Sequence, residues 1–378
     1  MRRLLLTVTA ALVPLIAALA LLTGSNRSSS VATSGYRAGA LVAYGEGASS
    51  NPDVGRLGDG IGLATIIGAT ATSAWGSPRW IVPLDGAWLT GRHFIADDAR
   101  GDTWVLAMRD NRFAPVRRLR PLWPRSYGRQ AVSRDGGHVA ATRARRQGGG
   151  YAPSSTIAVT DLDGRNRRTF SAGLVIGWSN RDEVAAAQAN GDVLLVDART
   201  GRRRVLLSAK RANRRLRART VEPERAAWSA DGRFAAIRVQ ATYVRRPHHR
   251  RGSTILLLDT TRPRAVRVLA SRYDISLFAW APRGDRFAYT TSGFPAPHEL
   301  WVTEGPGRTP RRLFATADRH FDWFTWAPDS TKILLDDQLA QTWRLFSLDG
   351  ALPRALARLG GRPLWCCAPT STLRSQAP

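Results

Sequence analysis

The sequence predicts an all-β fold built from repeated four-stranded antiparallel sheets. The phrase AAWSADGRFAAIRV, which starts at Ala226, returns as FAWAPRGDRFAYTT from Phe278. Each copy is followed by a short apolar run that ends at a turn, and then by a basic segment of strand length. Strands this short cannot bury both faces alone, but repeats stacked around an axis can. We therefore predict a β-propeller.

Six copies of the phrase share one bulky apolar anchor residue. The anchors are Trp88, Val132, Trp178, Trp228, Trp280 and Trp326, with successive separations of 44, 46, 50, 52 and 46 residues. A partial copy, PLWCCAP, places Trp365 another 39 residues on. We expect each anchor at the end of an innermost strand, where a large flat side chain fills the wedge between neighbouring blades. Asp-Gly, or a replacement for it, supplies the turn, and the alternating run after it forms the second strand.

The phrase resembles the WD40-like repeat of TolB-type propellers. The similar segments are W-S-x-D-G-R-F-A at 228–235, W-A-P-x-G-D-R-F-A at 280–288 and W-A-P-D-S at 326–330. The resemblance covers most of residues 86–369, and it departs from the pattern at Val132 and at 180–182. It implies a periplasmic or extracellular binding scaffold. Since members of that family bind diverse partners, the fold alone transfers no function.

The two ends of the chain decide the number of blades. Residues 39–84 hold three strand-like runs, GALVAY, IGLATIIGAT and RWIVPL, without an innermost strand, while the C-terminal copy stops after its innermost strand at about Ala368. Joining the two ends completes a seventh blade and hides both edges. We prefer seven blades closed in this way. Six is the alternative if the N-terminal segment is only a peripheral cap.

The N-terminus carries an export signal. Arg2 and Arg3 precede an apolar run from Leu4 to Leu22, so residues 1–24 are expected to be a signal peptide or an N-terminal membrane anchor. Ser-rich residues 25–38 read as a flexible linker, 39–369 as the propeller and 370–378 as a disordered tail. The expected location is extracellular, periplasmic or anchored to the outer side of the cytoplasmic membrane.

The charge is strongly basic, with 56 Lys and Arg against 29 Asp and Glu and a formal net charge of +27. In a four-stranded blade, the connections from strand 2 to 3 and from strand 4 to the next blade share one face. These connections are long and rich in Arg, at 120–129, 143–155, 208–220 and 242–253, whereas the tight turns on the other face carry Asp. We expect the first face to be the more cationic.

Loops that vary in length without disturbing a scaffold are where binding residues usually lie. The predicted anion- or partner-binding surface consists of Arg214, Arg215, Arg217, Tyr243, Arg245, Arg246, His248, His249, Arg250 and Arg251. Guanidinium groups can fork onto phosphate or carboxylate oxygens. The competing interpretation is that these are solvated loops enriched in arginine by codon bias.

No catalytic, cofactor-binding or metal-binding residue is predicted, and no cofactor. The chain has no G-x-S-x-G elbow and no H-E-x-x-H motif, and the adjacent Cys366 and Cys367 have no ligands at metal spacing. The acid pairs 97–98 and 336–337 are expected to be solvated turn residues, and His138 an ordinary histidine.

The favoured function is an exported, non-catalytic scaffold that binds proteins or anionic cell-envelope polymers through its Arg-rich loop face. The alternatives are a hydrolase or lyase with a site at the propeller channel, and a purely structural envelope component. We expect membrane contact only through the N-terminal segment, no specific nucleic acid partner and a monomeric state.

Overall fold

A computed structural model describes residues 40–45, 61–67, 70–77, 80–81, 93–98, 103–109, 112–118, 130–133, 137–147, 150–161, 164–243, 251–262, 266–270, 274–292, 297–317, 321–337, 340, 342–357 and 363–365. The chain divides into two units, Met1–Ala38 and Gly39–Pro378. All of the described residues belong to the second unit, so the expected signal segment and linker lie outside them, as does the C-terminal tail.

The described strands form seven four-stranded sheets, and every pairing within them is antiparallel. Three sheets come from the chain before residue 172 and from its C-terminal end. They contain β28 (Pro363–Trp365), β1 (Ala40–Gly45), β2 (Ile61–Ile67) and β3 (Thr70–Ser77); β4 (Trp80–Ile81), β5 (His93–Asp98), β6 (Thr103–Arg109) and β7 (Arg112–Arg118); and β8 (Gln130–Val132), β9 (His138–Gln147), β10 (Gly150–Asp161) and β11 (Arg168–Ser171).

The other four sheets follow in chain order, and the helix α2 (Ala209–Leu216) lies between the first two of them. They contain β12 (Leu174–Trp178), β13 (Glu183–Ala187), β14 (Val193–Asp197) and β15 (Arg203–Leu207); β16 (Thr220–Trp228), β17 (Phe234–Thr242), β18 (Arg251–Asp259) and β19 (Val266–Ala270); β20 (Asp274–Trp280), β21 (Phe287–Ser292), β22 (His298–Thr303) and β23 (Arg311–Thr316); and β24 (Phe321–Trp326), β25 (Lys332–Asp337), β26 (Thr342–Ser347) and β27 (Arg354–Ala357).

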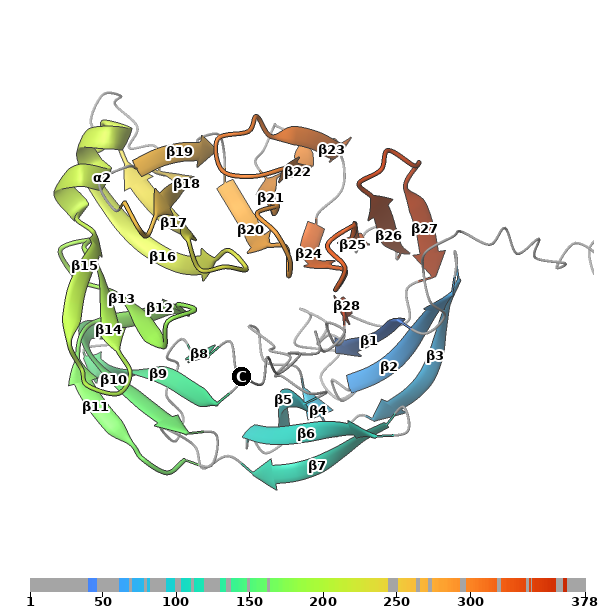
Figure 1. The fold of residues 1–378 in the computed structure, drawn as a ribbon, viewed down its shortest axis with the longest axis horizontal. Helices are drawn as coiled ribbons and strands as arrows, with labels where there is room; N and C mark the ends of the chain where they lie inside the picture. Colours follow the sequence, from blue (N-terminus) through green and yellow to red (C-terminus); the bar gives the residue numbers. More distant parts are fainter. Residues whose placement is uncertain are drawn as a thin grey trace, which may run out of the picture. The chain divides into compact units, whose positions relative to one another are not determined.

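Successive sheets meet through their first strands. β8 lies against β12, β12 against β16, β16 against β20, β20 against β24 and β24 against β28 (Figure 1). At the ends of the chain, β28 pairs with β1, with Val42 opposite Trp365. A first strand followed outward by three more is the arrangement that the repeats predict.

The core lies between neighbouring sheets. β17 shows the reason, because its side chains alternate between two apolar clusters. Ala235, Ile237 and Val239 pack against the sheet that contains β12, whereas Ala236 packs against the sheet that contains β20. Alternate residues of a strand face opposite sides of a sheet, so a strand buried on both faces needs apolar or small residues at every position.

The anchor tryptophans lie in these interfaces, as predicted. Trp178, Trp228, Trp280 and Trp326 end their strands, are at most 8% exposed, and pack in clusters with residues of the preceding sheet. Two of them also donate a hydrogen bond backwards. Trp280 Nε1 donates to the carbonyl of Ala227 at 3.0 Å, and Trp326 Nε1 to that of Ala279 at 3.2 Å.

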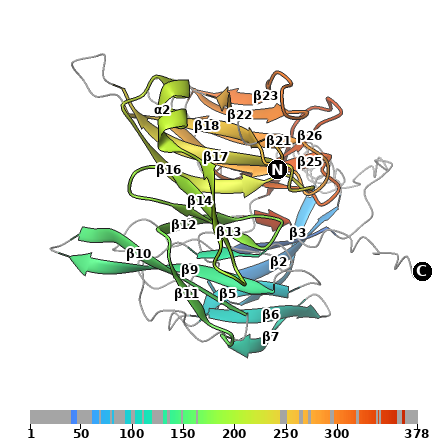
Figure 2. The same cartoon turned by 60° about the vertical axis from the view of Figure 1, so that its left-hand side comes forward.

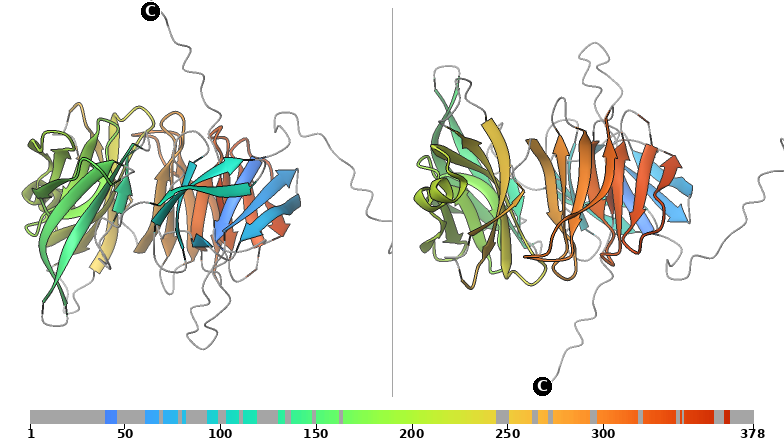
Figure 3. Two further views of the ribbon diagram at one scale, coloured as in Figure 1. Left: turned by 90° about the horizontal axis from the view of Figure 1, so that it is seen from below. Right: turned by 90° about the horizontal axis from the view of Figure 1, so that it is seen from above.

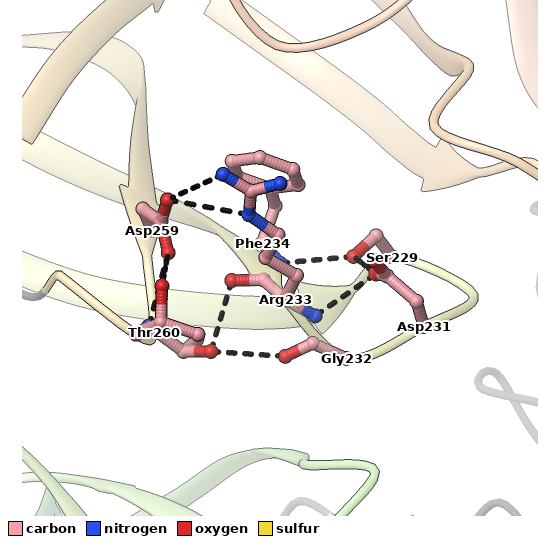
Figure 4. Close-up of polar contacts among 8 residues, drawn as sticks. Ser229, Asp231, Gly232, Arg233, Phe234, Asp259 and Thr260 are labelled. Carbon is pink, nitrogen blue, oxygen red and sulfur yellow. Dashed lines mark hydrogen bonds and ion pairs between the residues drawn. The ribbon is translucent and has the colours of Figure 1, made fainter.

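The turn after the anchor is held by polar contacts (Figure 4). The Ser229 hydroxyl accepts from the Phe234 backbone N–H at 2.9 Å and donates to Asp231 at 2.6 Å. Gly232 has φ +75°, a left-handed conformation that glycine adopts without steric cost. Other copies place Asp182, Gly284 or Ser330 at positive φ in the corresponding turn, so the predicted tolerance of unusual φ is confirmed.

Two expectations about the N-terminal strands are wrong. The run IGLATIIGAT does not form one strand, because Ile67 and Thr70 pair across a two-residue Gly-Ala connection and the chain continues as β3. With β3 in place the first sheet already has four strands. The run RWIVPL therefore starts the next sheet as β4, and Trp88 lies outside the described residues.

Of the four segments expected to be Arg-rich loops, 143–155, 208–220 and 242–253 contain regular structure in part, and 120–129 lies outside the described residues. Arg143–Gln147 pairs with Gly150–Thr156, apart from a register shift, so most of the predicted loop 143–155 is a hairpin. Figure 3 shows the ends of β9 and β10 extending beyond the neighbouring sheets. The predicted loop 208–220 contains α2. Among the described residues, no helix has the length and hydropathy needed to span a membrane.

Candidate functional site

The helix α2 forms because its sequence has a cap and an apolar face. The Ser208 hydroxyl accepts from the backbone N–H of Arg211, and Asp192 accepts from the N–H of Ala209 at 2.7 Å, so two of the unpaired N–H groups of the first turn are satisfied. Ala212 and Leu216, four residues apart, are buried against the sheet of β16–β19. Sequence reasoning missed this helix, although the Ser cap and the apolar spacing were both available.

The helix ends at Arg217, which is left-handed with φ 54° and ψ 35°. The N–H of Ala218 returns to the carbonyl of Asn213 at 3.0 Å, and the Asn213 amide donates to the Arg219 carbonyl at 3.1 Å. These contacts close the C-terminal end of the helix in the manner of a Schellman motif. The segment is therefore anchored to the propeller at both of its ends.

The outward side of this segment is cationic. Lys210, Arg214, Arg215 and Arg217 are exposed. Lys210, Arg214 and Arg217 are separated by four and three residues, so they follow one side of the helix. Among the residues that the structure describes, none of these four cations has a carboxylate within ion-pair distance. Three of the four are predicted site residues.

The second part of the predicted surface adjoins the end of α2. The N–H of Arg219 donates to the carbonyl of Thr242 at 2.8 Å, and Thr242 pairs with Arg251 at the start of β18. The residues just after α2 and the two ends of the 242–251 connection therefore lie at the same end of one sheet. Figure 2 shows α2 beside this sheet.

The structure describes only some of the predicted site residues in the 242–251 connection. Tyr243 is half-buried and packs against the cluster of apolar residues beneath α2, so at least part of its ring has a packing role. Arg251 belongs to β18, and its side chain is outside the described part of the structure. Arg245, Arg246, His248, His249 and Arg250 lie outside the described residues.

The turns at the opposite end of the sheet of β16–β19 hold their charges in internal contacts. Arg233 reaches Asp259 at 3.3 Å and covers the Phe234 ring at 4.9 Å, while the Thr260 hydroxyl donates to the carbonyls of Gly232 and Arg233 (Figure 4). Burial alone would raise the pKa of Asp259, but hydrogen bonds from Thr261 and Arg233 outweigh it and lower the pKa. These groups close the turns, so they do not form a free charged surface.

Two buried acids correct an expectation. Asp336 and Asp337 are fully buried, although the sequence suggested solvated turn residues. Asp337 accepts from Arg344 at 2.8 Å and from the N–H of Ala340 at 3.1 Å. The Asp337 carboxylate can be buried because Arg344 pairs with it. The local sequence pattern, which suggested a turn, does not reveal this partner.

His138 also has a specific setting. Its ring stacks on Trp178 of the next sheet and lies 3.3 Å from Asp161 and 3.8 Å from Asp182. These contacts join two sheets, which gives His138 a structural position. No group of three or more His, Cys, Asp or Glu side chains within the described ranges has the arrangement needed to hold a metal ion.

Comparison with known proteins identifies the fold. No protein-family model and no curated protein matches the chain. The β-propeller domain of Myceliophteria thermophila Cps50 (Swd1) has a similar structure, with a TM-score of 0.50 and 13% identity over 74% of this chain and 88% of that one. An oligogalacturonate lyase in complex with manganese matches with a TM-score of 0.51 and 12% identity, over 81% and 84%. TolB from Acinetobacter baumannii gives 0.48 and 13%, over 86% and 66%.

The chain is therefore a β-propeller. The predicted β-propeller fold is confirmed by the similarity to the Cps50 (Swd1) propeller domain. At these identities the similarity concerns the fold alone, and functional argument returns to the site.

Proposed function

We propose that this protein is an exported, non-catalytic propeller scaffold that binds proteins or anionic cell-envelope polymers. The binding surface is α2 together with the 242–251 connection. The observation that carries the proposal is the set of exposed cations on α2, which have no ion-pair partner among the described residues and stand on a helix capped at both ends.

Anchored cations suit this function for a physical reason. A basic loop that is free to move loses conformational entropy when it binds, whereas a packed helix presents its charges already in place. The paired arginines of the turns, such as Arg233 and Arg286, have carboxylates beside them. A polyanion that approached those arginines would compete with the existing ion pairs. At Lys210, Arg214 and Arg215 of α2 it meets no such competitor among the described residues.

Seven blades closed into a ring complete the proposal. The pairing of β28 with β1 and the contacts between successive first strands support this arrangement. In the closed ring each sheet packs face to face against two neighbours, which supports a stiff frame for the cationic surface. The apolar run after Arg2 and Arg3 supports export, and cell fractionation of a C-terminally tagged full-length chain tests it; recovery in the cytoplasm would contradict export.

The binding test removes the arginines of the connection. The full-length protein and a variant with Arg245, Arg246, Arg250 and Arg251 changed to Gln are titrated with polyphosphate and with poly-glutamate at several salt concentrations. Polyphosphate probes binding to a phosphate polymer, and poly-glutamate probes binding to an acidic protein surface. We expect the variant to bind at least one probe more weakly and with a flatter salt dependence. Unchanged binding of both probes would overturn the proposal.

A further inference from the structure

The outermost strands of six sheets share a feature that the seventh lacks. Each of the six carries at least one exposed arginine, and one from each strand is Arg118, Arg168, Arg203, Arg267, Arg311 and Arg354. An outermost strand presents unpaired backbone N–H and C=O groups, and charged residues on such an edge oppose pairing with another chain. These arginines therefore protect six edges.

The seventh outermost strand, β3, is unprotected. Its sequence, TATSAWGS, has no charged residue, and no charged residue or histidine occurs anywhere from Gly60 to Pro78. This is an unusual interval in a chain of which 22% is charged. Thr and Trp are favoured in strands, and eight residues is long for an edge.

The backbone of β3 is paired on one side. Its register runs from Ile61 opposite Ser77 to Ile67 opposite Thr70, all with β2. Among the described strands none pairs with the other edge, although β27 of the neighbouring sheet lies beside β3. Within the described residues, this edge of β3 is therefore open to a further antiparallel strand.

We propose that β3 is a self-association edge, on which the β3 strand of a second copy pairs antiparallel about a two-fold axis. The charge pattern selects this occupant. Two copies with a formal net charge of +27 repel each other, so contact is favoured where the local sequence is uncharged. Self-pairing of any other outermost strand would bring arginines of both copies together, which is unfavourable. The resulting dimer is isologous and closed, so it stops at two copies.

The pairing differs from the monomer expected from the sequence, and it is independent of the proposed anion binding. It is tested by measuring the mass of the full-length protein in detergent by light scattering, over a wide range of protein concentration. Thr72→Arg places a charge on β3. Thr169→Arg is the matched control, because Thr169 is exposed on β11, which already carries Arg168.

The expected result is a concentration-dependent dimer for the wild type and for Thr169→Arg, and a monomer for Thr72→Arg. Ser73→Lys serves as a second variant if Thr72→Arg does not fold, as judged by its circular dichroism. A wild type that stays monomeric throughout, or a folded edge variant that dimerises like the wild type, would overturn the proposal.

Discussion

The indole N–H of Trp280 donates a 3.0 Å hydrogen bond to the carbonyl of Ala227, one residue before the anchor of the preceding sheet. Through this bond and the one from Trp326 to Ala279, two blades are joined to the blades before them. Trp178 occupies the same position in its own repeat and is equally buried, but its Nε1 has no hydrogen-bond partner within the described structure.

Changing Trp280 to Phe therefore removes a made hydrogen bond, whereas Trp178→Phe removes none. We expect Trp280→Phe to lower the free energy of unfolding by about 1 kcal/mol more than Trp178→Phe does. Urea unfolding followed by far-UV circular dichroism measures the difference. Equal losses would show that the hydrogen bond contributes nothing beyond packing.

Gly177 lies where two neighbouring sheets approach each other closely. A Cβ added there would lie 2.3 Å from the carbonyl oxygen of Ala226, a backbone atom that has little freedom to move. We expect Gly177→Ala to destabilise the fold by roughly 1–3 kcal/mol through overpacking. Gly252→Ala is the control, since the nearest atom to its added Cβ is 4.0 Å away on the Tyr243 ring. The measurement is the midpoint temperature of thermal unfolding. A midpoint lowered equally by both changes would contradict the close approach.

The buried Asp337 depends on Arg344. Arg344→Met keeps much of the apolar volume but leaves the carboxylate without its cation, and we expect a loss of about 3–5 kcal/mol. Changing both residues, as Asp337→Leu with Arg344→Met, removes the unpaired charge and is expected to recover most of that loss. The comparison uses denaturant midpoints of the single and double variants. A double variant no more stable than Arg344→Met would argue against the pair.

We expect Asp197 to make the stability of the fold depend on pH. Hydrogen bonds from the backbone N–H and hydroxyl of Thr200 lower the pKa of Asp197 below its ordinary value of 3.8, against a smaller opposing effect of burial. A lowered pKa in the folded state means that the contribution to stability is present above about pH 4 and is lost as the pH falls through the folded-state value.

Accordingly, Asp197→Ala should be less stable than the wild type at pH 7, and the two should converge as the pH is lowered from 4 to 2. Unfolding midpoints at pH 7, 5, 4, 3 and 2 provide the measurement. A stability difference that stays constant down to pH 2 would contradict this role of the carboxylate.

The sequence was most informative where residues repeat. The tryptophan anchors, the turn residues and the alternation in β17 recur in register, and a residue that recurs in every blade meets the same packing requirement in each. The N-terminal strands were misassigned because they lack that phrase: a two-residue connection after Ile67 divides one apolar run, and Gly68, which favours such a turn, was counted as part of the strand.

The sequence could predict that the candidate site is rich in arginine, but not whether those arginines are paired. Arginine content drew attention to 208–220 and 242–253, but whether those charges are paired depends on contacts between distant segments. The carboxylate of Glu183 reaches Arg204 from another strand at 2.7 Å, whereas Arg214 and Arg215 of α2 meet no such partner among the described residues. Burial of Asp337 was missed for the same reason, because its cation lies on the next strand.

We propose that the position of the α2 cations, and not the total charge, confers anion binding. Changing Lys210, Arg214 and Arg215 to Gln leaves Arg217 to end the helix. The matched control changes Arg202, Arg203 and Arg308 to Gln, three exposed arginines away from α2. Both variants lose the same net charge.

The decisive measurement is the affinity of the three full-length proteins for polyphosphate as a function of salt. We expect the α2 variant to bind at least about tenfold more weakly and its logarithmic salt slope to fall by about 3, one for each lost contact, with the control close to the wild type. Equal weakening of the two variants would show that total charge, and not the position of the α2 cations, governs binding.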